Sequence, residues 1–579
     1  MATLNFKGKT FVQNHHLSVK YHQLVPKKAK SLTDKVSLND NLIVHGDNLK
    51  ALKALLPTYA GKVKCIYIDP PYNTGNEKWV YNDNVNSPMM QDWLGKVVDR
   101  EDLTRHDKWL CMIMPRLKLL RELLSEDGVI FVSIDDNEVH HLRMLMDEVF
   151  QGNFVAKIIW KSKGGSGTDP RYITVETEYI LCYAKSKNSL ILNRYSVDTS
   201  NYKLEDEYVK TRGRYKLNKL DRKSLGYIES LDFPIKHKGL VAVPGGKDNP
   251  KKIWRWRWSK EKVERGLRNE FIVLKKNAKG EASAYYKIYQ FCDNEGNLIS
   301  RQYPYNNLIP EEITTVAGTN EIEQIFSKRI FEYPKSSFLI EHLLKISTDK
   351  SSIILDSFAG SGTTAHAVLE LNKEDGGNRK FVLVECEDYA DKITAERVRR
   401  VIKGVKGAKD EKNNDSLKAV IPTKVGIQND LKILDSRLHG NDKTNNIVGG
   451  LGGTFSYFEL GDPIEMESIL EGDKLPTFLE LARYVFYTAT GEEFDPKKTK
   501  EKKNFIGESK EYEVYLFYKP DIEYLKLTAL TLERAKSLGQ YKGKKRLVFA
   551  PSKYLDTDYL LEYRIDYCQL PFEIYKLKE

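Results

Sequence analysis

Short apolar runs and amphipathic stretches alternate along the first third of the chain. Apolar runs between polar segments predict buried strands, and apolar residues spaced by three or four positions predict helices. We expect strands at residues 41–44, 63–68, 129–134, 156–160 and 179–183, and helices at 47–56, 109–124 and 138–150. This alternation predicts an α/β fold with a mostly parallel sheet that is covered by helices.

The same alternation returns in a second block near Ser336. Helices are expected at 336–346 and 365–371, and strands at 352–355 and 381–384. From 404 to 446 the composition shifts to Lys, Asn, Asp and Gly, which is typical of a linker. Within it, residues 419–442 resemble a translated dispersed palindromic repeat and are interpreted as an insertion. Aromatic-rich strands at 454–460, 513–518 and 546–550 then predict a small α+β domain.

The positive charge is concentrated between the two blocks. The whole chain of 579 residues has a net charge of +11, whereas residues 201–280 hold 22 basic and 10 acidic residues, or +12. A localised positive field favours a polyanionic partner such as DNA or RNA, although a solvated basic surface is the alternative.

The segment IWRWRWSK, residues 253–260, lies inside this basic region. Alternation with period two predicts a strand with its tryptophans on one face and its arginines on the other. We expect Arg255 and Arg257, with Lys251 and Lys252, to contact phosphate. A structural strand with solvated arginines is an equally good interpretation.

Other features narrow the class of protein. No long apolar run or secretory signal is present, which predicts a cytoplasmic protein that does not contact a membrane. The six cysteines never form a CxxC pair, so neither a disulfide framework nor a metal site is expected.

A glycine motif follows the predicted strand at 352–355. Asp356 ends the strand, and Phe358-Ala359-Gly360-Ser361-Gly362 leads into a helix. Small residues let a nucleotide-like ligand approach the free N–H groups of the helix. A Walker A loop is disfavoured because Thr363 stands where its lysine should be. Glu385, at the end of the next strand, is placed to accept hydrogen bonds from a ribose diol; a tight turn beside a surface glutamate is the alternative.

A second motif, Asp69-Pro70-Pro71-Tyr72, ends the predicted strand at 63–68. Two successive prolines remove backbone donors and stiffen the loop, which leaves its carbonyl groups free to accept. The Asp69 carboxylate and the adjacent carbonyl can each accept one N–H of an exocyclic amine, and Tyr72 can stack on a base. The alternative is a purely structural turn.

Together these motifs resemble the amino-methylating DNA methyltransferases. DPPYNTG (69–75) ahead of FAGSGTT (358–364) resembles their β subclass, in which the motifs are circularly permuted. Further similarity lies in LIVHGDNL (42–49), VSIDDNEVHHL (132–142), YILCYAK (179–185), YPKS (333–336) and LPFEIYKL (570–577). These segments are similar to modification subunits of type III restriction-modification systems. One departure is Thr177-Glu178, where His-Glu is expected.

The resemblance implies a role for each matching residue. The S-adenosylmethionine turn would comprise Asp356, Phe358, Ala359, Gly360, Gly362 and Thr363. Glu385 would bind the ribose hydroxyls, while Asp47 and Lys335 would lie beside the cofactor or base pocket. The target amine would be held by Asp69, Pro70, Pro71 and Tyr72.

The resemblance also implies the overall plan and activity. A Rossmann-like methyltransferase sheet would be formed by 1–185 and 331–403, a target-recognition region by 186–330, a linker by 404–446 and a C-terminal α+β domain by 447–579. The expected activity is methylation of the N6 amine of a flipped adenine in double-stranded DNA. Alternatives are a cytosine-N4 methyltransferase, disfavoured because those usually have Ser before Pro-Pro-Tyr, and a non-catalytic DNA-binding specificity subunit. A homodimer and a separate restriction subunit are implied as partners.

Overall fold

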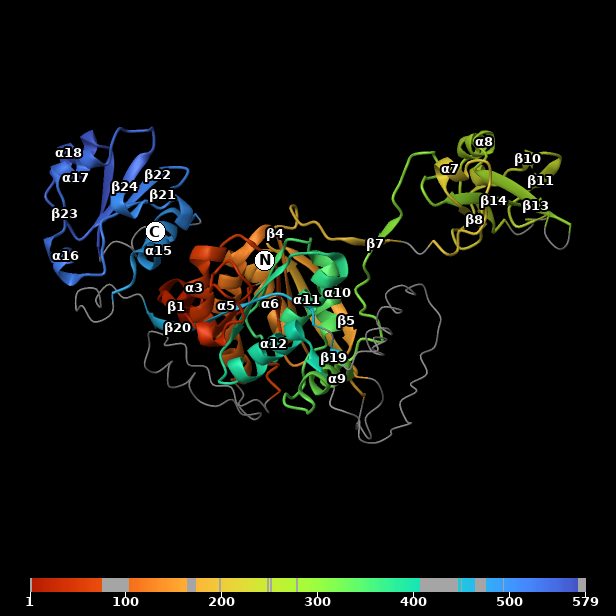
Figure 1. The fold of residues 1–579 in the computed structure, drawn as a ribbon. Helices are drawn as coiled ribbons and strands as arrows, with labels where there is room; N and C mark the ends of the chain where they lie inside the picture. Colours follow the sequence, from red (N-terminus) through yellow and green to blue (C-terminus); the bar gives the residue numbers. More distant parts are fainter. Residues whose placement is uncertain are drawn as a thin grey trace. The chain divides into compact units, whose positions relative to one another are not determined.

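The computed structural model of the chain describes residues 3–74, 104–163, 173–196, 199–246, 249, 252–276, 280–406, 446–448, 450–463, 475–492 and 494–570. These residues form two compact units (Figure 1). The first unit contains the described residues up to Asn193 and from Asn306 onward, and the second contains Arg194–Tyr305. The second unit therefore ends before the predicted boundary at residue 330.

A nine-stranded sheet forms the centre of the first unit. Its strands lie in the order β1 (His22–Pro26), β20 (Ser456–Pro463), β2 (Leu42–His45), β17 (Lys380–Glu385), β16 (Ile353–Asp356), β3 (Val63–Ile68), β4 (Leu124–Ile134), β6 (Thr177–Ala184) and β5 (Phe154–Lys161). The six strands from β20 to β4 run parallel to one another, whereas β1 and β6 are antiparallel to their neighbours. The predicted mostly parallel sheet is confirmed.

Helices cover both faces of this sheet (Figure 1). Alternate strand residues divide between two cores: Ile66 and Ile68 of β3 belong to one, and Cys65 and Tyr67 to the other. The first core is completed by α3 (Asn48–Tyr59), α5 (Arg105–Leu123) and α6 (Val139–Val149), and the second by α9 (Thr315–Phe326), α10 (Ser337–Ser347), α11 (Thr363–Asp375) and α12 (Glu396–Lys403). Such a three-layer arrangement is expected when strands are apolar on both faces.

The remaining elements of the first unit are short or peripheral. Among them are α1 (Lys9–Val12), α2 (His15–Ser18), the 3₁₀ turns Lys28–Lys30, Pro496–Lys498 and Glu501–Lys503, a π-helical turn Ala390–Ala395, and the two-stranded pair β18 (Val405–Lys406) and β19 (Asn446–Val448). Among the described residues, no helix is long and apolar enough to cross a bilayer.

The C-terminal region contributes to both the central sheet and a sheet of its own. We expected residues 454–460 to belong to a separate domain, but β20 lies in the central sheet between β1 and β2, so that expectation is wrong. The region's own sheet has the order β21 (Phe505–Glu508), β22 (Tyr512–Leu516), β24 (Lys545–Ala550) and β26 (Ile565–Gln569). Around it lie α15 (Phe478–Thr490), α16 (Ile522–Leu527), α17 (Leu532–Ser537), α18 (Thr557–Glu562) and the pair β23 (Ala529–Leu530) and β25 (Ser552–Lys553).

The second unit is a small α/β module with its own core. Its main sheet has the order β10 (Ile235–His237), β11 (Leu240–Ala242), β14 (Ala282–Tyr289) and β13 (Ile272–Lys276), and β8 (Tyr215–Lys219) also pairs with β14. Its other elements are α7 (Val209–Arg212), α8 (Lys260–Arg268), a 3₁₀ turn Glu229–Leu231, the pair β9 (Asp221–Arg222) and β12 (Arg255–Trp256), and the pair β7 (Arg194–Ser196) and β15 (Gln302–Pro304).

The predicted long strand at residues 253–260 is much shorter in the structure. Only Arg255 and Trp256 are in strand conformation, because the Ser259 side chain caps α8 and the chain turns into that helix. Trp256 and Trp258 are nonetheless buried in the core of this unit, with Trp256 Nε1 donating to the Phe233 carbonyl at 2.7 Å. The inward orientation is confirmed for these two tryptophans.

Candidate active site

The acidic residues expected to bind the cofactor or the target amine lie at the ends of four adjacent strands of the central sheet. Asp47 follows β2, Glu385 ends β17, Asp356 ends β16, and Asp69 follows β3. Because β2, β17, β16 and β3 are parallel neighbours, their carboxyl ends meet at one edge of the sheet. The structure therefore brings together the two motifs that are separated by almost three hundred residues in the chain.

The backbone of the Asp69–Tyr72 loop is fixed by contacts at Pro71 and at Asn73, the residue that follows the loop. Trp109, from α5, donates its Nε1–H to the Pro71 carbonyl at 2.6 Å. Asn73, which follows Tyr72, is fully buried and has a left-handed backbone with φ of 59°, a conformation that asparagine tolerates better than most residues. These contacts, together with the two prolines, fix the backbone of the loop.

Lys335 connects the side chains around this loop. Its ammonium lies 3.1 Å from Asp69 Oδ1 and 3.2 Å from Glu178 Oε2, and it donates to the Tyr72 hydroxyl at 2.9 Å. The Tyr72 hydroxyl in turn donates to Glu178 Oε2 at 3.0 Å. The Lys335 ammonium also lies 4.8 Å from the centre of the Tyr72 ring. One cation therefore organises two carboxylates and an aromatic ring.

The electrostatics of this network follow from its charges. Loss of water raises the pKa of Asp69, the nearby Lys335 opposes this rise, and Glu178 adds to it. Burial by itself lowers the pKa of Lys335, but Asp69 and Glu178 outweigh it, so the pKa lies above its usual value. Lys335 thus stays charged and helps to keep Asp69 ionised, which an acceptor of N–H bonds requires.

The glycine motif forms a tight turn between β16 and α11. Gly360 and Gly362 have φ of 51° and 81°, in the left-handed region that favours glycine. A Cβ on Gly362 would lie 3.0 Å from the Thr394 carbonyl oxygen, which leaves little room for a side chain. Phe358 is half-buried and Ala359 is buried beside this turn. The turn therefore presents backbone at the carboxyl edge of the sheet, as a small-ligand cradle requires.

Two acidic residues stabilise the turn. The buried Asp356 carboxylate accepts from Phe358 N–H at 3.0 Å and from the Thr364 hydroxyl at 2.5 Å. Glu385 accepts from Gly360 N–H at 2.7 Å and from Glu387 N–H at 3.0 Å. Burial is the main cause that raises the pKa of Asp356 to about 7 and the pKa of Glu385 above its usual value.

Lys335 also links the two motifs through its backbone. The Thr363 hydroxyl, at the first turn of α11, donates to the Lys335 carbonyl at 3.2 Å. The side chain of Lys335 contacts Asp69, as described above. Lys335 therefore lies between the glycine turn and the Asp69–Tyr72 loop.

Asp47 lies at the same edge, where it contacts the start of α3 and Arg116 of α5. It caps α3 by accepting from Lys50 N–H at 3.0 Å, and its carboxylate is 3.7 Å from Arg116 Nη2. The next residue, Asn48, donates its side-chain amide to the Ser357 carbonyl at 3.3 Å, so the start of α3 contacts the glycine motif.

Two parts of the site were missed by the sequence motifs. Glu178 was recognised only as part of a family segment, yet it contacts both Tyr72 and Lys335. Arg397, from α12, is fully buried and donates to Ser361 Oγ at 3.0 Å and Thr363 Oγ1 at 2.7 Å. It is also paired with Glu321 of α9 at 2.8 Å, so a buried ion pair supports the glycine turn. No local sequence signal marks this pair.

The basic residues predicted to contact DNA lie in the second unit. Arg255 and Arg257 are half-buried, and neither makes an ion pair within the part of the chain that the structure describes. Lys252 is exposed, with its ammonium 5.9 Å from the centre of the Tyr227 ring. Lys251 lies outside the described residues, as do Gly75 of the DPPYNTG segment and residues 571–577.

Asp356 should make the free energy of unfolding fall as pH rises, the opposite of the usual effect of a carboxyl group. Its pKa rises from 3.8 in the unfolded chain to about 7 in the folded chain, so the folded state holds the extra proton between these values. The free energy of unfolding therefore falls as pH increases from about 4 to 7, by at most about 1.4 kcal/mol per pH unit from this group. Urea unfolding at several pH values should show this slope in the wild type and its loss in Asp356→Asn.

Asp375→Asn provides a control of opposite sign. Burial favours a raised pKa for Asp375, but its hydrogen bonds from Arg379 lower the pKa overall. Its contribution to stability is complete above about pH 4 and is lost as pH falls further, so Asp375→Asn should remove a slope of opposite sign there and leave the slope between pH 4 and 7 unchanged. Identical slopes for wild type and Asp356→Asn would contradict the assignment of a raised pKa to Asp356.

Comparison with known proteins identifies the family. A family model described as "DNA methylase" matches residues 63–396, more than half of the chain. The chain is 33% identical to the Mod subunit of the type III restriction-modification enzyme EcoPI from Escherichia phage P1, over 67% of this chain and 64% of that protein. It is 29% identical to the StyLTI Mod subunit of Salmonella typhimurium, over 71% and 64% of the two chains.

A third relative is covered more completely. The chain is 32% identical to the type II methyltransferase M.KpnI of Klebsiella pneumoniae, over 62% of this chain and 82% of that protein. The chain spans about 64% of the length of the two Mod subunits. The similarity to type III modification subunits that the motifs suggested is confirmed, and the chain belongs to the DNA methylase family.

Proposed function

We propose that the chain is an S-adenosylmethionine-dependent DNA methyltransferase that modifies the N6 amine of adenine, and that it is the modification subunit of a type III restriction-modification system. The observation that carries this proposal is the position of Lys335, which contacts Asp69 through its side chain and the glycine turn through its carbonyl. An acceptor loop for an amine and a cradle for a methyl donor thus share one edge of the sheet.

The acceptor loop would prepare the amine for transfer. An exocyclic amine is a poor nucleophile because its lone pair is delocalised into the ring. The Lys335 ammonium already contacts Asp69 Oδ1, which leaves Asp69 Oδ2 to accept one N–H of the amine. The Pro70 carbonyl would accept the second N–H. These two bonds favour a pyramidal nitrogen with a localised lone pair. The rigid loop, including Pro71, would hold this geometry, and such positioning is worth up to about 7–11 kcal/mol.

The base must leave the duplex to reach this loop. Flipping costs a few kcal/mol, and stacking of the base on Tyr72 would return about 1–3 kcal/mol. The hydroxyl of Tyr72 is already held by Glu178 and Lys335, so its ring is fixed before the base arrives. After transfer, the methylated nitrogen is strongly acidic, so Asp69 can accept its proton without being a strong base.

The residues of the glycine motif fit S-adenosylmethionine. Left-handed glycines leave the turn open to a ligand, and Glu385 places a carboxylate beside Gly360 at the end of β17. When bound, the cofactor supplies an electrophilic methyl group on a sulfonium. The set that would hold it is Asp47, Lys335, Asp356, Phe358, Ala359, Gly360, Gly362, Thr363 and Glu385. Glu385 would exchange one of its backbone hydrogen bonds for the ribose hydroxyls.

The second unit would recognise the DNA. Residues 201–280 have an excess of twelve positive charges, and Arg255 and Arg257 lack acidic partners among the described residues. Lys252, and Lys251 beside it, would add phosphate contacts. Contacts to phosphate supply affinity but no base specificity. Double-stranded DNA is therefore the proposed substrate, and the bases that are read do not follow from these residues.

The proposed partners follow from the relatives. EcoPI and StyLTI are named as type III restriction-modification enzymes with a Mod subunit. By analogy with these relatives, this chain would act with a separate restriction subunit, and the resemblance of its motifs implies a homodimer.

Methyl transfer from tritiated S-adenosylmethionine to DNA tests the proposal. The wild type should label DNA that carries its recognition site, and Asp69→Ala should reduce the rate by at least about 100-fold, since removal of one group that stabilises the transition state typically costs this much. Binding of S-adenosylmethionine should be retained, because Asp69 is not in the glycine motif. The exposed Asp558→Ala is the matched control and should keep full activity.

The product decides which amine is modified. Hydrolysed DNA should contain N6-methyladenine, and N4-methylcytosine in its place would reject the adenine assignment. Absence of any labelling, with genomic DNA of varied sequence as substrate, would reject the proposed activity.

Replacement of Lys335 should move the pH dependence of methylation. In Lys335→Met the cation that lowers the pKa of Asp69 is lost, so Asp69 ionises only at higher pH. The acid limb of kcat at saturating S-adenosylmethionine should therefore shift to higher pH. Lys403→Met, a change at an exposed residue, should leave the acid limb of the kcat profile at the wild-type pH. A reduced rate without any shift would mean that Lys335 acts only through structure.

The arginines of the second unit should determine the salt dependence of DNA binding. Each lost phosphate contact lowers the slope of log affinity against log salt by about 0.9. The double variant Arg255→Gln, Arg257→Gln should therefore reduce the slope by about 1.8 on non-cognate DNA, measured by fluorescence anisotropy. Lys526→Gln, an exposed change in the C-terminal region, should leave the slope unchanged. An unchanged slope in the double variant would remove these arginines from the interface.

A further inference from the structure

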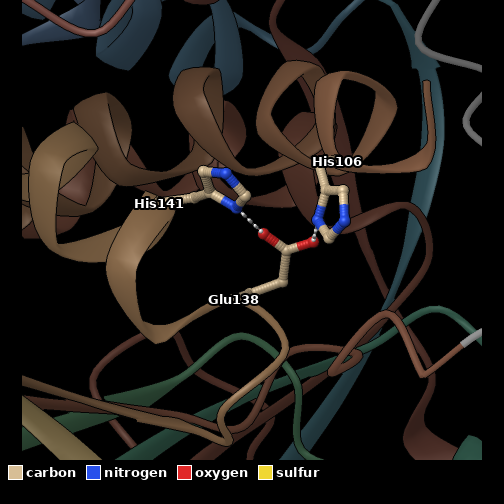
Figure 2. Close-up of side chains that lie close together, drawn as sticks. All are labelled: His106, Glu138 and His141. Carbon is tan, nitrogen blue, oxygen red and sulfur yellow. Dashed lines mark hydrogen bonds and ion pairs between the residues drawn. The ribbon is translucent and has the colours of Figure 1, made fainter. Parts of the chain in front are cut away.

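Three potential metal ligands converge beside the proposed base-binding loop. His106 lies in the first turn of α5, Glu138 occupies the position just before α6, and His141 lies in the first turn of α6. Figure 2 shows the two imidazole rings directed at opposite oxygens of the Glu138 carboxylate. His106 Nδ1 is 2.6 Å from Glu138 Oε1, and His141 Nδ1 is 2.8 Å from Glu138 Oε2. None of the three takes part in the proposed methyl transfer.

The burial of Glu138 shows that this cluster is a defined feature of the fold. The Glu138 side chain has no exposed surface, and a buried carboxylate is unfavourable unless it is fully partnered. Besides the two imidazoles, Glu138 Oε1 accepts from the side-chain amide of Asn73. A hydrogen bond of this kind orients a carboxylate that ligates a metal ion.

We propose that His106, Glu138 and His141 bind a divalent transition metal ion, with Zn²⁺ as the first candidate. Two imidazoles and one carboxylate form a ligand set that Zn²⁺ uses in proteins, and they leave a fourth position for water. Imidazole ligands favour Zn²⁺ and its neighbours over Mg²⁺ and Ca²⁺, which prefer oxygen.

The positions of the ligand atoms are compatible with this assignment. The three candidate atoms lie within 4.8 Å of one another. Tetrahedral Zn²⁺ with bonds of about 2.0–2.1 Å holds its ligand atoms about 3.3 Å apart. The two imidazole–carboxylate contacts of 2.6 and 2.8 Å would therefore lengthen, and the wider separation within the set would shorten. The side chains of His106 and His141 are 33% and 26% exposed and can rotate, whereas Glu138 remains fixed. Arg105 Nε, 3.4 Å from His106 Nε2, would lose this long contact when His106 ligates through Nδ1.

The consequence of metal binding would be mechanical. The ion would join the start of α5 to the start of α6, and Glu138 would transmit this constraint to Asn73, four residues after Asp69. The metal would thus stiffen the loop that presents the acceptor groups. Because the site is defined by binding alone, its test does not depend on the proposed methyltransferase activity.

Direct metal titration tests the proposal. The full chain, without a histidine tag and stripped with a chelator, should bind one equivalent of Zn²⁺ in competition with a chromophoric chelator. His106→Gln and His141→Gln keep a side-chain N–H donor for Glu138 but remove a strong ligand, so each should weaken binding by at least about 100-fold. His140→Ala is the matched control: His140 neighbours His141, with ring centres 4.0 Å apart, but lies outside the ligand set, and affinity should change less than about 3-fold.

Two further measurements separate a metal site from a hydrogen-bond network. Co²⁺ should give visible absorption of tetrahedral intensity in the wild type but not in the glutamine variants. Zn²⁺ should raise the unfolding temperature of the wild type only, while the metal-free proteins unfold alike. Failure to bind either ion, or equal binding by wild type and both glutamine variants, would overturn the proposal. If a glutamine variant does not fold, the Co²⁺ spectrum of the other decides the question.

Discussion

The candidate site depends on the ion pairs that the Lys335 ammonium makes with two carboxylates. The ammonium faces these carboxylates, Asp69 and Glu178, in a region largely removed from water. Without it, two negative charges would lie close together with little solvent to screen them, and the pKa of Asp69 would rise further. The site therefore requires a cation at this point, and the carbonyl of the same residue is bound to the glycine turn. Lys335 thus both balances the charge of Asp69 and Glu178 and links the Asp69–Tyr72 loop to the glycine turn.

The arrangement of the sheet explains how a permuted chain can build this site. The chain makes β2 and β3 first, and β16 and β17 are inserted between them only after a long intervening segment. Because all four strands are parallel, the order in which they are made does not affect which ends meet. The acceptor loop and the glycine turn are therefore neighbours in space, although the basic unit separates them in sequence.

The sequence patterns predicted those parts of the fold that are set by residues close together in the chain, such as strand periodicity and turns. The strand Val63–Ile68 was expected with the bounds that the structure has, and the glycine turn and the Asp69–Tyr72 loop lie at strand ends as expected. The ion pair of Arg397 with Glu321 could not be predicted, since it joins helices 76 residues apart and leaves no periodic signal. The prediction of a strand at 253–260 was wrong for a different reason. Ser259 caps α8, and the chain turns into this helix although Trp and Arg alternate with the period of a strand.

The position of β20 has a consequence for how the protein can be made. The edge strand β1, near the start of the chain, pairs with β20, and β20 also lies against β2. During synthesis on a ribosome, β1 has no partner in this sheet until residues beyond 456 have emerged. Until then β2 is an open edge, which can pair with strands of other chains. The sheet that carries the proposed catalytic residues is thus completed only after β20, Ser456–Pro463, has left the ribosome.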